Sequence, residues 1–194
     1  MIRRFLAVAV LAVAVSACET PDPTPRYADI TFSHLAKIKL DVGAVDYVQA
    51  YTPPSKIPNV DHLFPLRPSA VARRWAEERL EAAGPISRVA RVTLVNASVI
   101  GSALETTQGI KGLFTVDQAA RYDATVEILI EIVNSQGVVE GRASAVAQRS
   151  RTAPENITLN ERDQIWFELT EAVMSDLDKE LEATIGKYLA KYVR

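Results

Sequence analysis

Hydrophobic and polar residues alternate along three stretches in the middle of this chain. Residues 121–134 alternate most regularly, and residues 89–104 and 138–150 follow the same period of two, with a phase slip near Val95. The sequence NSQG at 134–137 joins two of these stretches and predicts a tight hairpin turn. One apolar and one polar face along each stretch predict strands of an antiparallel sheet that is covered on one side.

Two other stretches repeat their apolar residues at intervals of three and four, which predicts amphipathic helices. The first spans about 69–83 and ends before the Gly-Pro pair at 84–85. Its apolar face consists of Val71, Ala72, Trp75, Leu80 and Ala83. The second spans about 160–193, and Thr158 with Glu161 has the spacing of a capping box at its start. Its apolar stripe consists of Trp166, Leu169, Val173, Leu177, Leu181, Ile185, Leu189 and Tyr192.

A further strand precedes the first helix. Residues 35–47 alternate with a period of two, and their apolar phase shifts at Gly43, which indicates a bulge. Gly186 is a weak point of the second helix, where that helix is expected to end or bend. We expect a single α+β domain over residues 27–194, in which an antiparallel sheet of about four strands carries two helices on one face, in the order β-α-β-β-β-α.

The first 18 residues, MIRRFLAVAVLAVAVSAC, differ in composition from the rest of the chain. Arg3 and Arg4 form a positively charged start, an apolar run extends from Phe5 to Val15, and small residues follow. This arrangement is typical of a secretory signal peptide. The apolar run is too short for a transmembrane helix, which needs about 20 apolar residues.

The four residues Val15, Ser16, Ala17 and Cys18 resemble the lipobox of bacterial lipoproteins. The resemblance implies that a diacylglycerol is attached to the Cys18 sulfur and that residues 1–17 are removed as a signal peptide. The sequence holds one cysteine, so no disulfide within the chain competes for it. The alternative is an ordinary secretory signal with an incidental cysteine.

Residues 18–26 follow as the lipidated cysteine and a proline-rich tether. Alternating prolines favour an extended conformation of about 3.1 Å per residue, which gives the tether a reach of roughly 25 Å. The predicted location is the bacterial cell envelope, with the lipid in a membrane and the domain in the periplasm. Enteric lipoproteins that stay in the inner membrane carry aspartate after the cysteine, so Glu19 favours the outer membrane.

The charge of the chain bears on its partners. Without residues 1–17 the chain has 20 basic and 24 acidic residues, a net charge of −4, which argues against a nucleic-acid binder. The sequence contains no nucleophile elbow, phosphate-binding loop or dinucleotide fingerprint. We therefore expect a protein that is not an enzyme and that has no cofactor other than the covalent lipid on Cys18.

Few residues suit a metal or catalytic site. His34 and His62 are far apart in the sequence and neither has a second ligand at metal-binding spacing, so no metal is expected. Asp61 next to His62 could form a polar site, and Glu127 with Glu131 could act as an acid–base pair on one face of a strand. The commoner interpretation is that both sets are solvated residues of a loop and a sheet face.

Residues 105–118 connect two predicted strands and are unusually apolar for a loop. Ile110, Leu113 and Phe114 lie between glycines and polar ends. Apolar side chains at a loop tip need a surface that covers them. Two interpretations stay open: the three side chains contact a partner protein or a membrane, or the loop folds back onto the core.

The overall layout resembles the auxiliary lipoproteins of ABC-type transport systems. The shared features are the lipobox, the proline tether, a proline-rich loop at 52–68, a helix with Trp75, paired long strands and a terminal helix. The resemblance implies a non-enzymatic accessory component of a transport or envelope-assembly complex, with an envelope protein as partner and the membrane as support. A periplasmic carrier or sensor of a small hydrophobic ligand is the alternative, and an envelope hydrolase is a third hypothesis.

Overall fold

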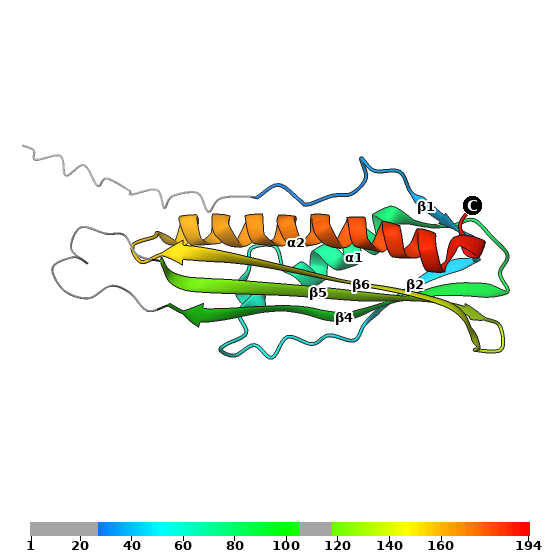
Figure 1. Cartoon of the computed structure of the whole chain (residues 1–194), viewed down its shortest axis with the longest axis horizontal. Coiled ribbons are helices and arrows are strands. Elements are labelled where there is room, and N and C mark those ends of the chain that lie inside the picture. Colours follow the sequence, from blue (N-terminus) through cyan, green and yellow to red (C-terminus); the bar gives the residue numbers. More distant parts are fainter. Residues whose placement is uncertain (1–26, 105–117) are drawn as a thin grey trace, which may run out of the picture.

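The computed structural model describes residues 27–104 and 118–194. Its centre is a four-stranded sheet in the order β2-β4-β5-β6 (Figure 1). The strands are β2 (Ala44–Gln49), β4 (Arg88–Ala103), β5 (Gln118–Asn134) and β6 (Val139–Pro154). β4 and β5 pair antiparallel, as do β5 and β6, and these three strands correspond to the three alternating stretches of the sequence.

The burial of β5 confirms the predicted alternation. Ile128, Ile130 and Ile132 are fully buried on the face toward the helices. Glu127 and Glu131 alternate with them and therefore point to the opposite face. The period of two in the sequence thus identifies the two faces of the sheet correctly.

Two irregularities of the meander also lie where the sequence predicts them. The register of β4 against β5 shifts between Leu94 and Asn96, so Val95 is the extra residue of a β-bulge at the phase slip. At the turn between β5 and β6, Gly137 has a φ of +80° and its N–H donates to Asn134 O at 2.9 Å. A positive φ costs glycine little, which suits this position to a tight hairpin.

The sheet is mixed rather than purely antiparallel, and our prediction was wrong on this point. β2 pairs parallel with β4, with Ala44 opposite Val89 and Gln49 opposite Leu94. Alternation in a sequence reveals the faces of a strand but not its direction. Residues 50–87 form a crossover that includes α1, and a crossover of this kind places the next strand parallel to the first.

The first helix, α1 (Pro68–Arg79), is shorter than predicted. At Leu80 the backbone becomes extended, with φ −101° and ψ 136°. The chain then enters a small parallel sheet, which consists of β1 (Ile38–Leu40) and β3 (Leu80–Ala82). The prediction that Leu80 and Ala83 belong to the apolar face of the helix was wrong. The physical reason is backbone pairing with β1, which continues to Ala83, whose N–H donates to Leu40 O at 2.9 Å.

The predicted strand at 35–47 divides into β1 and β2, which belong to different sheets. Gly43 lies between the two strands rather than in a bulge of one strand, which corrects that prediction. A Cβ atom on Gly43 would lie 2.5 Å from the Cα atom of Ile86. Two backbones therefore pass so closely here that a side chain would not fit.

The second helix, α2 (Leu159–Tyr188), confirms the predicted terminal helix and its capping box. The Glu161 N–H donates to the Thr158 hydroxyl at 3.2 Å, and the Thr158 N–H donates to the Glu161 carboxylate at 2.7 Å. The helix continues through Gly186, so the predicted end or bend at that residue was wrong. A 3-10 turn, η3 (Ala190–Tyr192), follows the helix.

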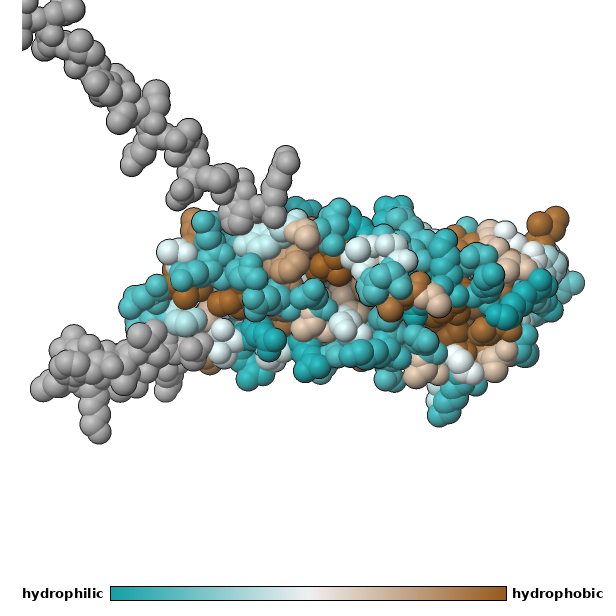
Figure 2. All heavy atoms as spheres, turned by 90° about the horizontal axis from the view of Figure 1, so that it is seen from above, coloured by the Kyte–Doolittle hydropathy of each residue, from teal (hydrophilic) through white to brown (hydrophobic). Residues whose placement is uncertain are grey.

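Both helices cover one face of the sheet, as predicted (Figure 1). The buried hydrophobic residues of the described chain form one cluster between these layers, and the largest of them include Trp75 of α1 and Trp166 of α2. The outer surface on the helix side is mostly hydrophilic, with several separate hydrophobic patches (Figure 2). Within residues 27–104 and 118–194, no helix combines the length and the apolar character needed to cross a membrane.

Candidate functional site

The residues that the sequence indicates for lipidation and partner contact lie outside the described residues. They are Cys18, Ile110, Leu113 and Phe114. The structure does describe the strands on either side of the last three, where the Leu104 N–H donates to Ala119 O at 2.8 Å. Tyr27 and the start of α2 lie at this same end of the domain (Figure 1). The chain therefore enters the described domain at the end where β4 stops and β5 begins.

Residues 27–36, here called the N-terminal segment, follow the predicted tether directly. In Figure 1 they run alongside α2. Tyr27 stacks on Phe167 of α2 with the ring centroids 5.0 Å apart, and its hydroxyl donates to Asn160 O at 3.3 Å. The beginning of the segment is thus attached to the first turns of α2.

Charged side chains of α1 hold the rest of the N-terminal segment. Arg74 donates to a backbone carbonyl of the segment at 3.1 Å. The Glu78 carboxylate accepts from the backbone N–H of Phe32, and Phe32 itself is buried. Arg79 donates to the backbone carbonyl of Ala36. The segment is therefore fixed by both helices through contacts to its backbone as well as to its side chains.

Glu78 is the acidic group of this attachment. Burial raises the pKa of the Glu78 carboxyl, but hydrogen bonds from the Phe32 N–H and the Thr31 hydroxyl and the charge of Arg74 outweigh that effect. The pKa of Glu78 is therefore held below its ordinary value. The carboxylate stays ionised at neutral pH, where it keeps its hydrogen bonds to the segment.

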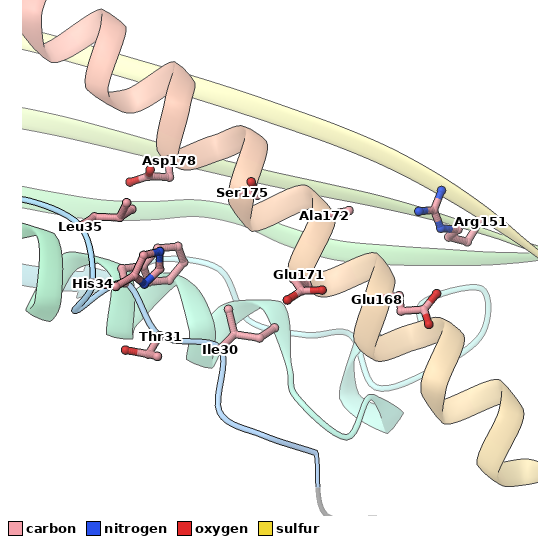
Figure 3. A pocket seen from close by; sticks show the side chains of 11 residues that line it. Ile30, Thr31, His34, Leu35, Arg151, Glu168, Glu171, Ala172, Ser175 and Asp178 are labelled. Carbon is pink, nitrogen blue, oxygen red and sulfur yellow. The ribbon is translucent and has the colours of Figure 1, made fainter.

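A groove of about 500 Å³ opens between the N-terminal segment and α2 (Figure 3). Its apolar lining consists of Ile30, Phe32, Leu35 and Ala172. Its polar lining consists of Thr31, His34, Arg151, Glu168, Glu171, Ser175 and Asp178. Within the described residues, neither Glu168 nor Glu171 forms an ion pair. The groove therefore combines an apolar surface with carboxylates that have no cationic partner there.

Asp178 anchors a buried polar network at one end of this groove. The side chain of Asp178 is 9% exposed and that of Arg79 is 2% exposed. The Oδ1 atom of Asp178 accepts from Arg79 Nε at 2.7 Å and from Trp75 Nε1 at 2.8 Å. Arg79 Nη2 also donates to Glu182 Oε2 at 2.7 Å. This network joins α1, α2 and the N-terminal segment, because Arg79 reaches Ala36 as well.

Neither the groove nor the network was predicted from the sequence. A signal was present, because Arg79 and Asp178 each continue the apolar face of a helix. Arg79 follows Trp75 by four residues, and Asp178 precedes Leu181 by three. A charge at such a position is buried, and it needs a partner of opposite sign. One basic and one acidic residue of this kind on two helices indicate a buried pair.

Asp61 and His62 lie in a 3-10 turn, η1 (Asp61–Leu63), next to β4. Asp61 is buried close to Tyr51, and burial together with the charge of Asp61 raises the pKa of Tyr51 to about 12. The Nδ1 atom of His62 has no hydrogen-bond partner among the described residues. His34 lines the groove instead, so the structure does not bring the two histidines together. In the described parts of the chain, no three His, Cys, Asp or Glu side chains are placed to hold a metal ion.

Glu127 and Glu131 share the face of β5 that points away from the helices. Glu131 is 9% exposed and accepts from Arg142 Nη2 at 2.7 Å, and Arg91 Nη1 lies 3.8 Å from its other oxygen. These residues belong to three neighbouring strands, so the contacts are cross-strand ion pairs. The arrangement links the strands and surrounds Glu131 with cationic groups.

Comparisons with known proteins give distant structural likenesses. No protein-family model and no curated protein sequence matches the chain. Among solved structures, the chain is similar to rare lipoprotein B from Shewanella oneidensis, with 11% identity over 75% of this chain and 96% of that one and a TM-score of 0.40. It is also similar to a minor lipoprotein from Acinetobacter baumannii, with 12% identity over 75% of this chain and 92% of that one and a TM-score of 0.41. At these scores the likenesses assign neither a family nor a function to the chain.

Proposed function

We propose that the protein is a lipid-anchored lipoprotein of the bacterial envelope whose domain binds a partner component and is not an enzyme. The partner complex that fits best is one for transport or envelope assembly. The observation that carries the proposal is the attachment of the N-terminal segment to α1 and α2. If the lipid only kept the protein at the membrane, the segment after the tether would not need to be attached to the helices. An anchor that also orients the domain does need this attachment.

The attachment fixes the point at which the tether joins the domain. Tyr27 is held on the first turns of α2, and Cys18 precedes it by nine positions. An extended tether of this length reaches roughly 25 Å. Together they favour an orientation in which the end of the domain with Tyr27, the end of β4 and the start of β5 is nearest to the membrane. Glu19 after the cysteine favours the outer membrane over the inner one.

The same geometry supports the contact proposed for Ile110, Leu113 and Phe114. These residues stay a prediction, since they lie outside the described part of the chain. The described strands that flank them meet at the end of the domain where α2 begins, and Tyr27 stacks on the first turns of α2. Apolar side chains carried there are well placed to reach a membrane-bound partner or the membrane itself.

Replacement of Cys18 by serine tests the anchor. We expect Cys18→Ser to abolish labelling with a fatty-acid analogue and to leave the protein in the soluble fraction or as unprocessed precursor. Ser16→Ala is the matched control, because it keeps a small residue in the lipobox and should label normally. Normal labelling of Cys18→Ser would contradict the proposal.

Joint replacement of Ile110, Leu113 and Phe114 by serine tests the contact. If these residues bind a partner, we expect crosslinking to envelope neighbours to be lost while the melting temperature stays unchanged. Thr106→Ala with Thr107→Ala is the matched control in the same loop and should crosslink normally. A large fall in melting temperature, or undiminished crosslinking, would show that the loop does not serve as a contact site.

The second candidate function is a carrier or sensor of a small hydrophobic ligand held between the sheet and the helices. The core counts against it, because that space is occupied. Trp75, Trp166, Leu169, Met174, Leu177 and Leu181 are each at most 2% exposed there. A ligand between the layers would have to displace these side chains, and a native lipid found in the purified protein by mass spectrometry would favour this candidate instead.

A further inference from the structure

We propose that the groove beside α2 binds an extended segment of the partner protein in which a lysine or arginine lies between apolar residues. The inference rests on the proposed binding function and names the chemistry of the partner. It comes from three features of the groove: its apolar floor, its unpaired carboxylates and its open form.

The floor suits aliphatic side chains. Ile30, Leu35 and Ala172 line the groove from opposite sides, the first two from the N-terminal segment and the third from α2. The volume of about 500 Å³ lies inside the range of ligand sites, about 300–1,000 Å³. This is space for a few side chains, whose burial would supply the apolar part of the binding free energy.

The carboxylates of the groove favour a positively charged ligand group. Glu168 and Glu171 lie along the exposed side of α2 and form no ion pair within the described residues. Asp178 is more than nine-tenths buried, and both of its hydrogen bonds in the described structure fall on Oδ1. Arg79 and Trp75 already occupy this carboxylate, so an ammonium or guanidinium group is attracted instead to Glu168 and Glu171, which lie about one turn apart on α2.

The lining also includes His34 of the N-terminal segment and Arg151, whose position is compatible with this assignment. Arg151 of β6 lies at the end of the groove near Glu168, away from Asp178 (Figure 3). Arg79 already donates to Asp178 from the side of the core. The groove is therefore most negative at Glu171, while Arg151 can donate to carbonyl groups of a bound peptide backbone.

The form of the groove favours a peptide over a small amine. One wall is the N-terminal segment and the other is the surface of α2, so the site is a channel between two elements (Figure 3). Sites for small ligands usually enclose most of the ligand surface. A channel with an apolar floor and a charged rim instead resembles the part of a protein interface that receives one anchoring side chain and its neighbours.

A peptide titration tests the proposal on the full lipoprotein in non-ionic detergent. The probes are acetyl-Gly-Leu-Lys-Leu-Gly-amide, its counterpart with glutamate in place of lysine, and hexylammonium. Methyl NMR signals of Ile30, Leu35 and Ala172 report on the groove. We expect saturable shifts of these signals with the lysine peptide and none with the glutamate peptide.

Charge variants of α2 sharpen the test. Glu168→Gln with Glu171→Gln keeps the shape of the groove and should weaken binding of the lysine peptide about fivefold or more. Glu155→Gln with Glu180→Gln changes the net charge equally outside the groove and should bind like the parent.

Four results would overturn the proposal. They are an absence of saturable shifts, equal binding of both peptides, unchanged affinity of the groove variant, and binding of hexylammonium as tight as that of the peptide. The last result would assign the groove to small amines. The titration measures peptide binding to the folded domain, whereas fatty-acid labelling measures lipidation of Cys18. The two assays therefore distinguish a failure of the groove proposal from a failure of the proposed envelope function.

Discussion

Replacement of Arg79 by methionine should lower the free energy of unfolding by about 3–5 kcal/mol, the usual cost of removing one partner from a buried ion pair. Methionine fills a similar volume but donates no hydrogen bond. The Asp178 carboxylate, whose side chain is 9% exposed, would then keep only the bond from Trp75 within the network described above. The cost arises because a buried charge is left without its counter-charge, not because a surface contact is lost.

Two further variants separate this explanation from a general packing defect. Arg79→Met combined with Asp178→Leu removes both buried charges and should recover about half of the loss, because what remains is the unpaired Trp75 N–H, at about 1–3 kcal/mol. Arg73→Met is the matched control on α1. Arg73 forms an exposed ion pair with Glu77, and losing it should cost at most about 0.5 kcal/mol.

Urea unfolding followed by circular dichroism measures these differences, provided that the slope of the transition is equal among the variants. The reasoning would be refuted if Arg79→Met cost no more than Arg73→Met. It would also be refuted if the double variant were less stable than Arg79→Met alone, since that result would mean that shape, rather than an unpaired charge, decides the stability of the helix pair.

Two more predictions concern the core and the N-terminal segment. Trp166→Ala should destabilise the protein by about 3–5 kcal/mol in thermal unfolding, because the ring is 2% exposed and stacks on Phe64 at 4.7 Å. Trp166→Phe should cost much less, since Trp166 Nε1 has no partner among the described residues, and equal losses would contradict this. Glu78 has a lowered pKa in the folded state, so its contribution to stability is complete above its ordinary value of 4.5 and is lost as the pH falls through the lowered pKa. Glu78→Gln should therefore flatten the pH dependence of stability in that acidic range, and a profile identical to that of the parent would contradict the attachment described for Phe32.

The sequence predicted those parts of the fold in which local pattern and final structure agree. α2 combines an uninterrupted apolar stripe with a capping box, and both depend on residues three or four positions apart. The bulge at Val95 and the turn at Gly137 are likewise local. The direction of β2 could not be predicted in this way, because its parallel pairing depends on a crossover of 38 residues, 50–87, whose path is not encoded in any local pattern.

The groove could not be predicted for a similar reason. Its walls come from residues 30–35 and 168–178, which are far apart in the sequence and individually ordinary. Leu80 shows the same difficulty on a small scale, because a leucine after a helix fits either the next helical turn or a strand. Pairing with a neighbouring strand decides between the helical and the extended conformation, and for Leu80 the pairing with β1 stabilises the extended one.

The topology also sets an order of stability within the domain. β5, β6 and α2 follow one another with connections of four residues each, whereas β2, a six-residue strand, is joined to the sheet across a long crossover. Closing a long connection costs entropy, and short edge strands open most readily, so hydrogen exchange should be fastest in β2. The N-terminal segment leads through β1 into β2. Tension on a lipid anchor would therefore first load the contacts of that segment with α2 and α1 and then β1 and β2, while β4, β5 and β6 stay folded.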